Sequence, residues 1–188
     1  MSETTIVAPD GRRERGDASR REILDAASRV IVDNGVDALT HRSVAEAAGV
    51  PLARVSYHYP KVDDLMVAAA TQYLDAFDNR LRTLADSARA GKRSMVDACT
   101  VFLFELVTVQ SREFLGMVEV RLALHRRGRT VNDAGVVRII RSFGADERRA
   151  LSIVAAMFGF AVLAATAPVP VTQSQVRTHV RSILGGTT

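Results

Sequence analysis

The sequence predicts an all-α protein. Apolar residues recur every three or four positions through most of the 188 residues, as they do along one face of a helix. Helix-starting and helix-ending residues divide this pattern into segments, and only five prolines interrupt it. No segment alternates convincingly between apolar and polar residues as a strand would. At this length, with 47% hydrophobic residues, the chain is large enough for one small domain and one helical domain.

The first expected helix begins at a capping box, in which Ser19 caps the helix and Glu22 reaches back to its start. It ends at Asn34 and Gly35, a pair typical of a left-handed stop. One face is apolar, formed by Ile23, Ala27, Val30 and Ile31. Residues 1–18 are polar, contain several arginines and lack the apolar core of a secretion signal, so we expect a disordered basic arm.

Residues 40–55 have the pattern of a helix-turn-helix. Thr40 can cap the first short helix, and Pro51 has no amide to leave unsatisfied at the start of the second. Ala45 is small enough for the helices to touch, and Gly49 tolerates the positive φ of the corner. The inward-facing set is Val44, Ala48, Val50 and Val55. The alternative reading is a helical hairpin that serves only as core.

Over residues 19–65 the chain resembles the TetR family of bacterial transcription regulators. The matching segments fall in register without insertion: residues 23–27, 34–35, 39–45, 48–50 and 55–60. The resemblance implies a helix-turn-helix DNA-binding domain over 19–62 and a helical ligand-binding and dimerisation domain over 63–188. Two positions depart from the family, which usually has tyrosine at Ser56 and lysine at Val62. Lys61 stands where the family has a small capping residue, and can supply the lost backbone contact from one position earlier.

The candidate DNA contacts cluster around the second motif helix, whose N-terminal end would enter the major groove. Arg54 suits a bidentate contact to guanine, while Leu52 or Ala53 suits a thymine methyl. Through the resemblance, Arg42 is expected to reach a base or a phosphate. The expected phosphate contacts are Thr40, Tyr57, His58 and Lys61. For His58, packing behind the recognition helix is an equal alternative.

The formal net charge of +4 does not by itself predict DNA binding. Residues 1–62 contain nine basic and nine acidic residues, whereas residues 89–188 contain fourteen basic and seven acidic ones. The placement of the charges argues for DNA instead, because several basic side chains can share one surface of the motif. Besides the candidate contacts, this surface would include Arg20, Arg21 and His41.

The rest of the chain predicts further helices. A long amphipathic helix is expected over 63–88, followed by helices over 93–109, 112–127, 134–143, 146–166 and 173–184. From Leu151 onward the helix over 146–166 is apolar on every side, so one face can cover its own core while another meets a partner. We expect a homodimer interface formed by Leu151, Val154, Phe158, Val162, Val176, Val180 and Ile183. A purely single-chain helical core is the alternative.

A pocket for an unknown small-molecule effector follows mainly from the resemblance. Its candidate lining is Phe77, Phe102, Glu105, Leu106, Met117, Arg121 and Phe158. Aromatic and methionine positions at helical spacing are more often ordinary core. Arg121 and Glu105 could each be a polar anchor for a ligand. Alternatively, each is a side chain whose charged end lies in solvent.

The sequence gives little support for other functional classes. The four histidines lack metal-ligand spacing, and neither a nucleophile motif nor a phosphate-binding loop is present, so we expect no enzyme, cofactor or metal site. The single cysteine, Cys99, excludes an internal disulfide and suits a buried position. The longest apolar run, residues 153–165, is short for a membrane span. We expect a cytoplasmic, dimeric repressor that binds a palindromic double-stranded DNA operator; a helical protein-interaction module is the alternative.

Overall fold

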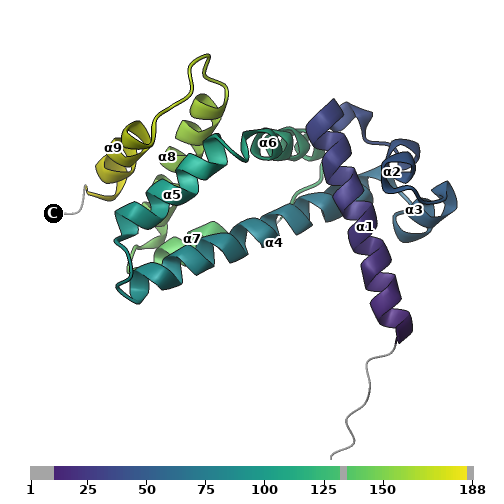
Figure 1. Ribbon diagram of the computed structural model, residues 1–188, viewed down its shortest axis with the longest axis horizontal. Helices are drawn as coiled ribbons and strands as arrows, with labels where there is room; N and C mark the ends of the chain where they lie inside the picture. Colours follow the sequence, from purple (N-terminus) through teal and green to yellow (C-terminus); the bar gives the residue numbers. More distant parts are fainter. Residues whose placement is uncertain (1–10, 132–134, 186–188) are drawn as a thin grey trace, which may run out of the picture. The chain divides into compact units, whose positions relative to one another are not determined.

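The computed structural model describes residues 11–131 and 135–185, and over these ranges the prediction of an all-α protein is confirmed. The described residues form two compact units, divided between residues 69 and 70. Figure 1 labels the helices of both units. The long helix α4, Val62–Arg89, contributes its first residues to the first unit and the remainder to the second.

The first unit is built from α1 (Gly11–Asn34), the short helix η1 (Val36–Ala38), α2 (His41–Ala48), α3 (Leu52–His58) and the start of α4. Its core is formed by fully buried apolar side chains from each α-helix: Ile23, Ala26, Ala27, Val44, Val55, Leu65 and Met66. The expected apolar face of α1 is therefore the buried face of this helix, which packs mainly against α2.

The expected start of α1 at Ser19 was wrong, because the helix begins at Gly11. Ser19 therefore lies inside the helix, where its backbone amide already has a helical partner and no cap is needed. Of the expected disordered arm, residues 1–10 lie outside the described residues and residues 11–18 form the first turns of α1. The end is as expected: α1 stops at Asn34, and Gly35 has a positive φ of 82°.

The second unit contains the remainder of α4 together with α5 (Met95–Val107), α6 (Ser111–Arg126), α7 (Gly135–Arg141), α8 (Glu147–Ala165) and α9 (Gln173–Leu184). Each helix lies within a few residues of its predicted range. Side-chain caps begin three of them, at Ser94, Asp146 and Thr172. In Figure 1, α5 runs beside α8 and α9. Together with Phe114 of α6, they form a shared core of Leu103, Leu106, Val107, Ala161, Ala164, Val176 and Val180.

Burial within α8 and α9 corrects part of the expected dimer interface. Val176 and Val180 are fully buried inside the single chain, against α5, so neither can face a partner. Leu151 and Phe158 are about half exposed, at 51% and 43%. Val154, Val162 and Ile183 are partly buried. A partly exposed ion pair between Asp97 on α5 and Arg177 on α9, 2.5 Å apart, also joins these two helices.

Helix α8 has the length and composition of a membrane-crossing helix, a test that the core helices of soluble proteins also pass. In the single chain only four of its side chains are buried: Ala150, Ile153, Ala161 and Ala164. Large apolar side chains remain exposed on it, including Leu163 at 73%. An apolar helix with this much exposed surface is typical of an interaction face.

Candidate nucleic-acid interface

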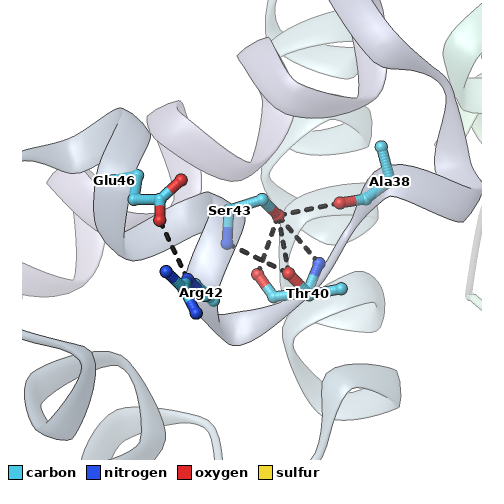
Figure 2. A network of polar contacts seen from close by, with 5 residues as sticks. All are labelled: Ala38, Thr40, Arg42, Ser43 and Glu46. Carbon is cyan, nitrogen blue, oxygen red and sulfur yellow. Dashed lines mark hydrogen bonds and ion pairs between the residues drawn. The ribbon is translucent and has the colours of Figure 1, made fainter.

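Local hydrogen bonds define both ends of α2. The Thr40 hydroxyl accepts a hydrogen bond from the Ser43 amide at 3.0 Å, and the Ser43 hydroxyl accepts one from the Thr40 amide at 3.0 Å (Figure 2). This reciprocal pair is a capping box, with serine in place of the more usual glutamate. At the other end Gly49 has φ 65° and ψ 30°, the left-handed geometry that turns the chain from α2 into α3.

Helix α3 presents one face to solvent and anchors the other. Val55 is fully buried and fixes the helix against the core of the first unit. Leu52, Ala53 and Arg54, in the first turn, are all exposed, with Leu52 at 49%. Exposed residues in the first turn of the second helix are those that reach base edges in a helix-turn-helix.

The remaining candidate contacts lie around the same short helices. Tyr57, at the end of α3, is 82% exposed, and Lys61 is exposed just before α4. Arg42 is exposed at the start of α2, where its Nε donates to the Glu46 carboxylate at 3.1 Å (Figure 2). The hydroxyl of Thr40 participates in the cap of α2.

His58 is partly buried, with its Nε2 atom 3.4 Å from the Ser19 hydroxyl on α1. Burial lowers the pKa of its imidazole, and the positive charges of Arg20 and Arg54 lower it further. The packing and the DNA-facing interpretations of His58 are therefore compatible. Its ring contacts α1, and two arginines of the expected DNA surface lie close enough to affect its charge.

Sequence reasoning expected His41 on the DNA-facing surface and did not consider Arg29, so it missed two contacts that hold the motif together. The imidazole of His41 lies 2.7 Å from the Tyr59 carbonyl oxygen, which ties the start of α2 to the end of α3. Arg29 on α1 donates to the carbonyl oxygen of Ala47 at 3.0 Å. Neither pair has a sequence signal, because the partners are 18 residues apart and one atom of each is backbone.

A central cavity of about 140 Å³ in the second unit gathers most of the predicted pocket residues. Phe77, Phe102, Leu106, Met117, Arg121 and Phe158 all line it. Aromatic rings meet edge to face in two pairs: Phe77 with Phe102, centroids 4.7 Å apart, and Phe114 with Phe158, 5.7 Å apart. Glu105 is not in the lining, because its carboxylate pairs with the guanidinium of Arg80.

Two polar groups near this cavity are affected by burial. The Tyr73 hydroxyl is buried without a hydrogen-bond partner among the described residues, and burial raises its pKa. Burial also raises the pKa of the Cys99 thiol to about 11, so this thiol stays protonated at neutral pH. Across the described ranges, no group of three His, Cys, Asp or Glu side chains is arranged to hold a metal ion.

Comparison with known proteins agrees with this geometry. Residues 23–69 match the family described as bacterial regulatory proteins, tetR family. Comparison with curated proteins gives no significant match to this sequence. The fold is similar to that of the multidrug binding protein EbrR complexed with ethidium, with a TM-score of 0.74 and 28% identity over 88% of this chain and 98% of that one. A TetR-family member (SCO1917) from Streptomyces coelicolor A3 gives the same TM-score and identity, covering 88% of this chain and 97% of that one. EbrR complexed with malachite green gives a TM-score of 0.71 and 27% identity, covering 87% and 96%.

Proposed function

We propose that this chain, whose DNA-binding unit and fold are those of the TetR family of bacterial regulatory proteins, is a ligand-responsive repressor that binds a palindromic operator as a homodimer. The family match and the similar structures support the general role of a DNA-binding transcription regulator. Its proposed partner, chromosomal DNA, places it in the cytoplasm.

The observation that carries the DNA-binding proposal is the exposed first turn of α3 above the buried Val55. In this arrangement Arg54 reads a guanine through paired hydrogen bonds, while Leu52 or Ala53 contacts a thymine methyl. Arg42 reaches DNA by exchanging its exposed Glu46 partner for a base or a phosphate. Such an exposed ion pair contributes little to stability, so the exchange costs little.

The phosphate contacts position the protein without reading sequence. Tyr57 and Lys61 are exposed and free to reach the backbone on either side of the groove. The Thr40 hydroxyl donates to the Ser43 hydroxyl at 3.0 Å, and it can exchange this hydrogen bond for one to a phosphate while its oxygen still accepts from the Ser43 amide. His58 contributes through its exposed edge.

The dimer proposal rests on the exposed apolar stripe of α8. Leu151 and Phe158 leave large apolar surfaces uncovered in the single chain, and by helical spacing Val154 and Val162 lie on the same side of the helix. Leu163 is exposed as well, about a third of a turn farther round. A two-fold pairing of this stripe buries it on both copies at once, and a two-fold protein matches a palindromic operator. Ile183, which is partly buried on α9, remains part of the proposed interface.

The effector proposal rests on the aromatic central cavity and on the EbrR structures with bound small molecules. Ethidium is a cation, whereas the central cavity here has Arg121 and no acidic residue in its lining. An uncharged or anionic aromatic compound therefore suits it better. At about 140 Å³ the cavity must expand to hold a drug-sized ligand.

The decisive experiment measures binding of the purified protein to DNA selected from a random pool, across a series of salt concentrations. Arg54→Ala should cost about 1 to 3 kcal/mol on the selected site and relax the preference at one base pair. Lys61→Ala should weaken all DNA and reduce the salt slope by about one. Arg82→Ala, an exposed change on α4 outside the motif, should leave both properties unchanged.

Two outcomes would contradict this proposal. If no sequence is enriched from the pool, the chain is a helical interaction module and not a DNA-binding regulator. If Arg54→Ala weakens random and selected DNA equally, α3 does not read bases.

A further inference from the structure

A larger cavity lies beside the central one in the second unit. Its volume is about 690 Å³, within the range of about 300 to 1,000 Å³ usual for small-molecule sites. It lies among the C-terminal part of α4, the start of α5, α7, the start of α8 and the end of α9. Four side chains line both cavities and separate them: Leu81, Cys99, Ile140 and Met157.

Most of this larger cavity is apolar, with Leu84, Met95, Ile139 and Ile153 among its lining residues. The charged residues of the lining are Arg149, Arg181 and Asp146. They come from the N-terminal end of α8 and the C-terminal part of α9. The cavity therefore combines apolar walls with two guanidinium groups and one carboxylate.

The carboxylate of Asp146 already has a local partner. It accepts a hydrogen bond from the Arg149 amide at 2.8 Å and so caps α8. Its negative charge is thus held by the start of the helix, where the positive end of the helix dipole stabilises it. The two arginine side chains are left as the groups able to bind a charged ligand.

Neither arginine has a carboxylate partner among the described residues. Arg149 Nη2 lies 3.5 Å from the Ile183 carbonyl oxygen, which is long for a hydrogen bond. The Arg181 side chain has no hydrogen bond or ion pair within the described part of the chain. By contrast, Arg177 on the same helix as Arg181 is paired with Asp97. The larger cavity therefore retains unpaired positive charge beside apolar walls.

We propose that this larger cavity binds an anionic amphiphile, a carboxylate on an apolar chain. The carboxylate pairs with Arg149 and Arg181, and the chain lies along Leu84 and Ile139 toward the shared wall at Met157. Guanidinium groups suit this role because they match the two oxygens of a carboxylate. A cation would be repelled, and an alcohol on the same chain would form no ion pair with the arginines. Binding to this site does not depend on DNA recognition.

The test is calorimetric titration of the full-length protein, without DNA, with octanoate, 1-octanol and octylammonium, each below its aggregation limit. Octanoate is expected to bind and to raise the melting temperature, while octylammonium should not bind and 1-octanol should bind at least tenfold more weakly. Arg149→Gln and Arg181→Gln should each weaken octanoate binding by about tenfold. Arg148→Gln is the matched control, since this exposed residue of α8 does not line the cavity.

Three results would overturn the proposal: no octanoate binding, equal binding of the three compounds, or full octanoate affinity in both cavity variants. Loss of binding in Arg121→Gln alone would place the ligand in the central cavity instead. Arg181 is exposed, so Arg181→Gln is expected to fold. This variant therefore still tests the proposal if Arg149→Gln does not fold. Because no DNA is present, a lack of octanoate binding would not contradict the proposed regulatory function. Conversely, a failure to bind DNA would not contradict the proposed binding of an anionic amphiphile.

Discussion

The guanidinium of Arg29 donates a hydrogen bond from Nη2 to the Ala47 carbonyl oxygen at 3.0 Å. Ala47 lies in the last turn of α2, where backbone carbonyls have no partner within their own helix. Arg29 of α1 therefore provides the hydrogen-bond donor that the Ala47 carbonyl lacks within α2. This contact holds the end of α2 in place just before the turn that positions α3.

We predict that Arg29→Ala lowers the free energy of unfolding by about 1 kcal/mol, the usual contribution of such a hydrogen bond. Urea unfolding followed by circular dichroism measures the change. Arg82→Ala removes an equally exposed arginine from α4 and should have almost no effect. Equal stability of both variants would show that the Arg29 contact contributes nothing.

The left-handed turn at Gly49 gives a second prediction. No atom lies within 4 Å of a Cβ added there, so Gly49→Ala is opposed by backbone strain at φ 65° and not by a clash. We expect a loss of about 1 kcal/mol, and a smaller loss for Gly49→Asn because asparagine tolerates this conformation. Gly16→Ala is the control: its site in α1 is also open, and the change should stabilise by about 0.5 to 1 kcal/mol. If Gly49→Ala and Gly16→Ala changed the free energy of unfolding in the same direction, the proposed backbone strain at Gly49 would be contradicted.

The third prediction separates the interaction face of α8 from the core. Leu163→Asp places a charge on a side chain that is 73% exposed, so the helical content should persist while the proposed dimer dissociates. Val180→Asp buries a charge at a fully buried position and should unfold the second unit. Light scattering and circular dichroism distinguish the two results, with Thr178→Asp on the exposed face of α9 as control. A Leu163→Asp protein that remains dimeric would exclude this face.

The fourth prediction concerns pH. Burial lowers the pKa of His58, and the charges of Arg20 and Arg54 lower it further. An NMR titration of its ring signals should therefore give a pKa below the ordinary 6.5 of an unfolded chain. Between these two values the unfolded chain binds more protons than the folded one. The free energy of unfolding therefore falls as the pH drops through about 6.5 toward the folded-state pKa. His58→Gln should remove this contribution, and Arg20→Gln should raise the pKa. A measured value at or above 6.5 would refute the assignment.

The sequence by itself determined the helices of the DNA-binding motif, because their signals are local. Thr40 and Gly49 act within a few residues of the backbone they cap or turn, so their roles are readable in order along the chain. The same holds for the end of α1 at Gly35. Its start at Gly11 was not readable, because the capping box at Ser19 is only one of the positions at which such a helix can begin.

Only the tertiary structure decided which apolar faces are core. The spacing of α9 shows that Val176 and Val180 share one apolar face, but only the packing of α9 against α5 shows that this face belongs to the chain's own core and not to a partner. In the same way, the cavity with Arg149 and Arg181 is assembled from parts of five helices, with α4 and α5 before α6 in the sequence and α7, α8 and α9 after it. Periodicity identifies a helix, whereas the neighbour that covers each face depends on the packing of the whole unit.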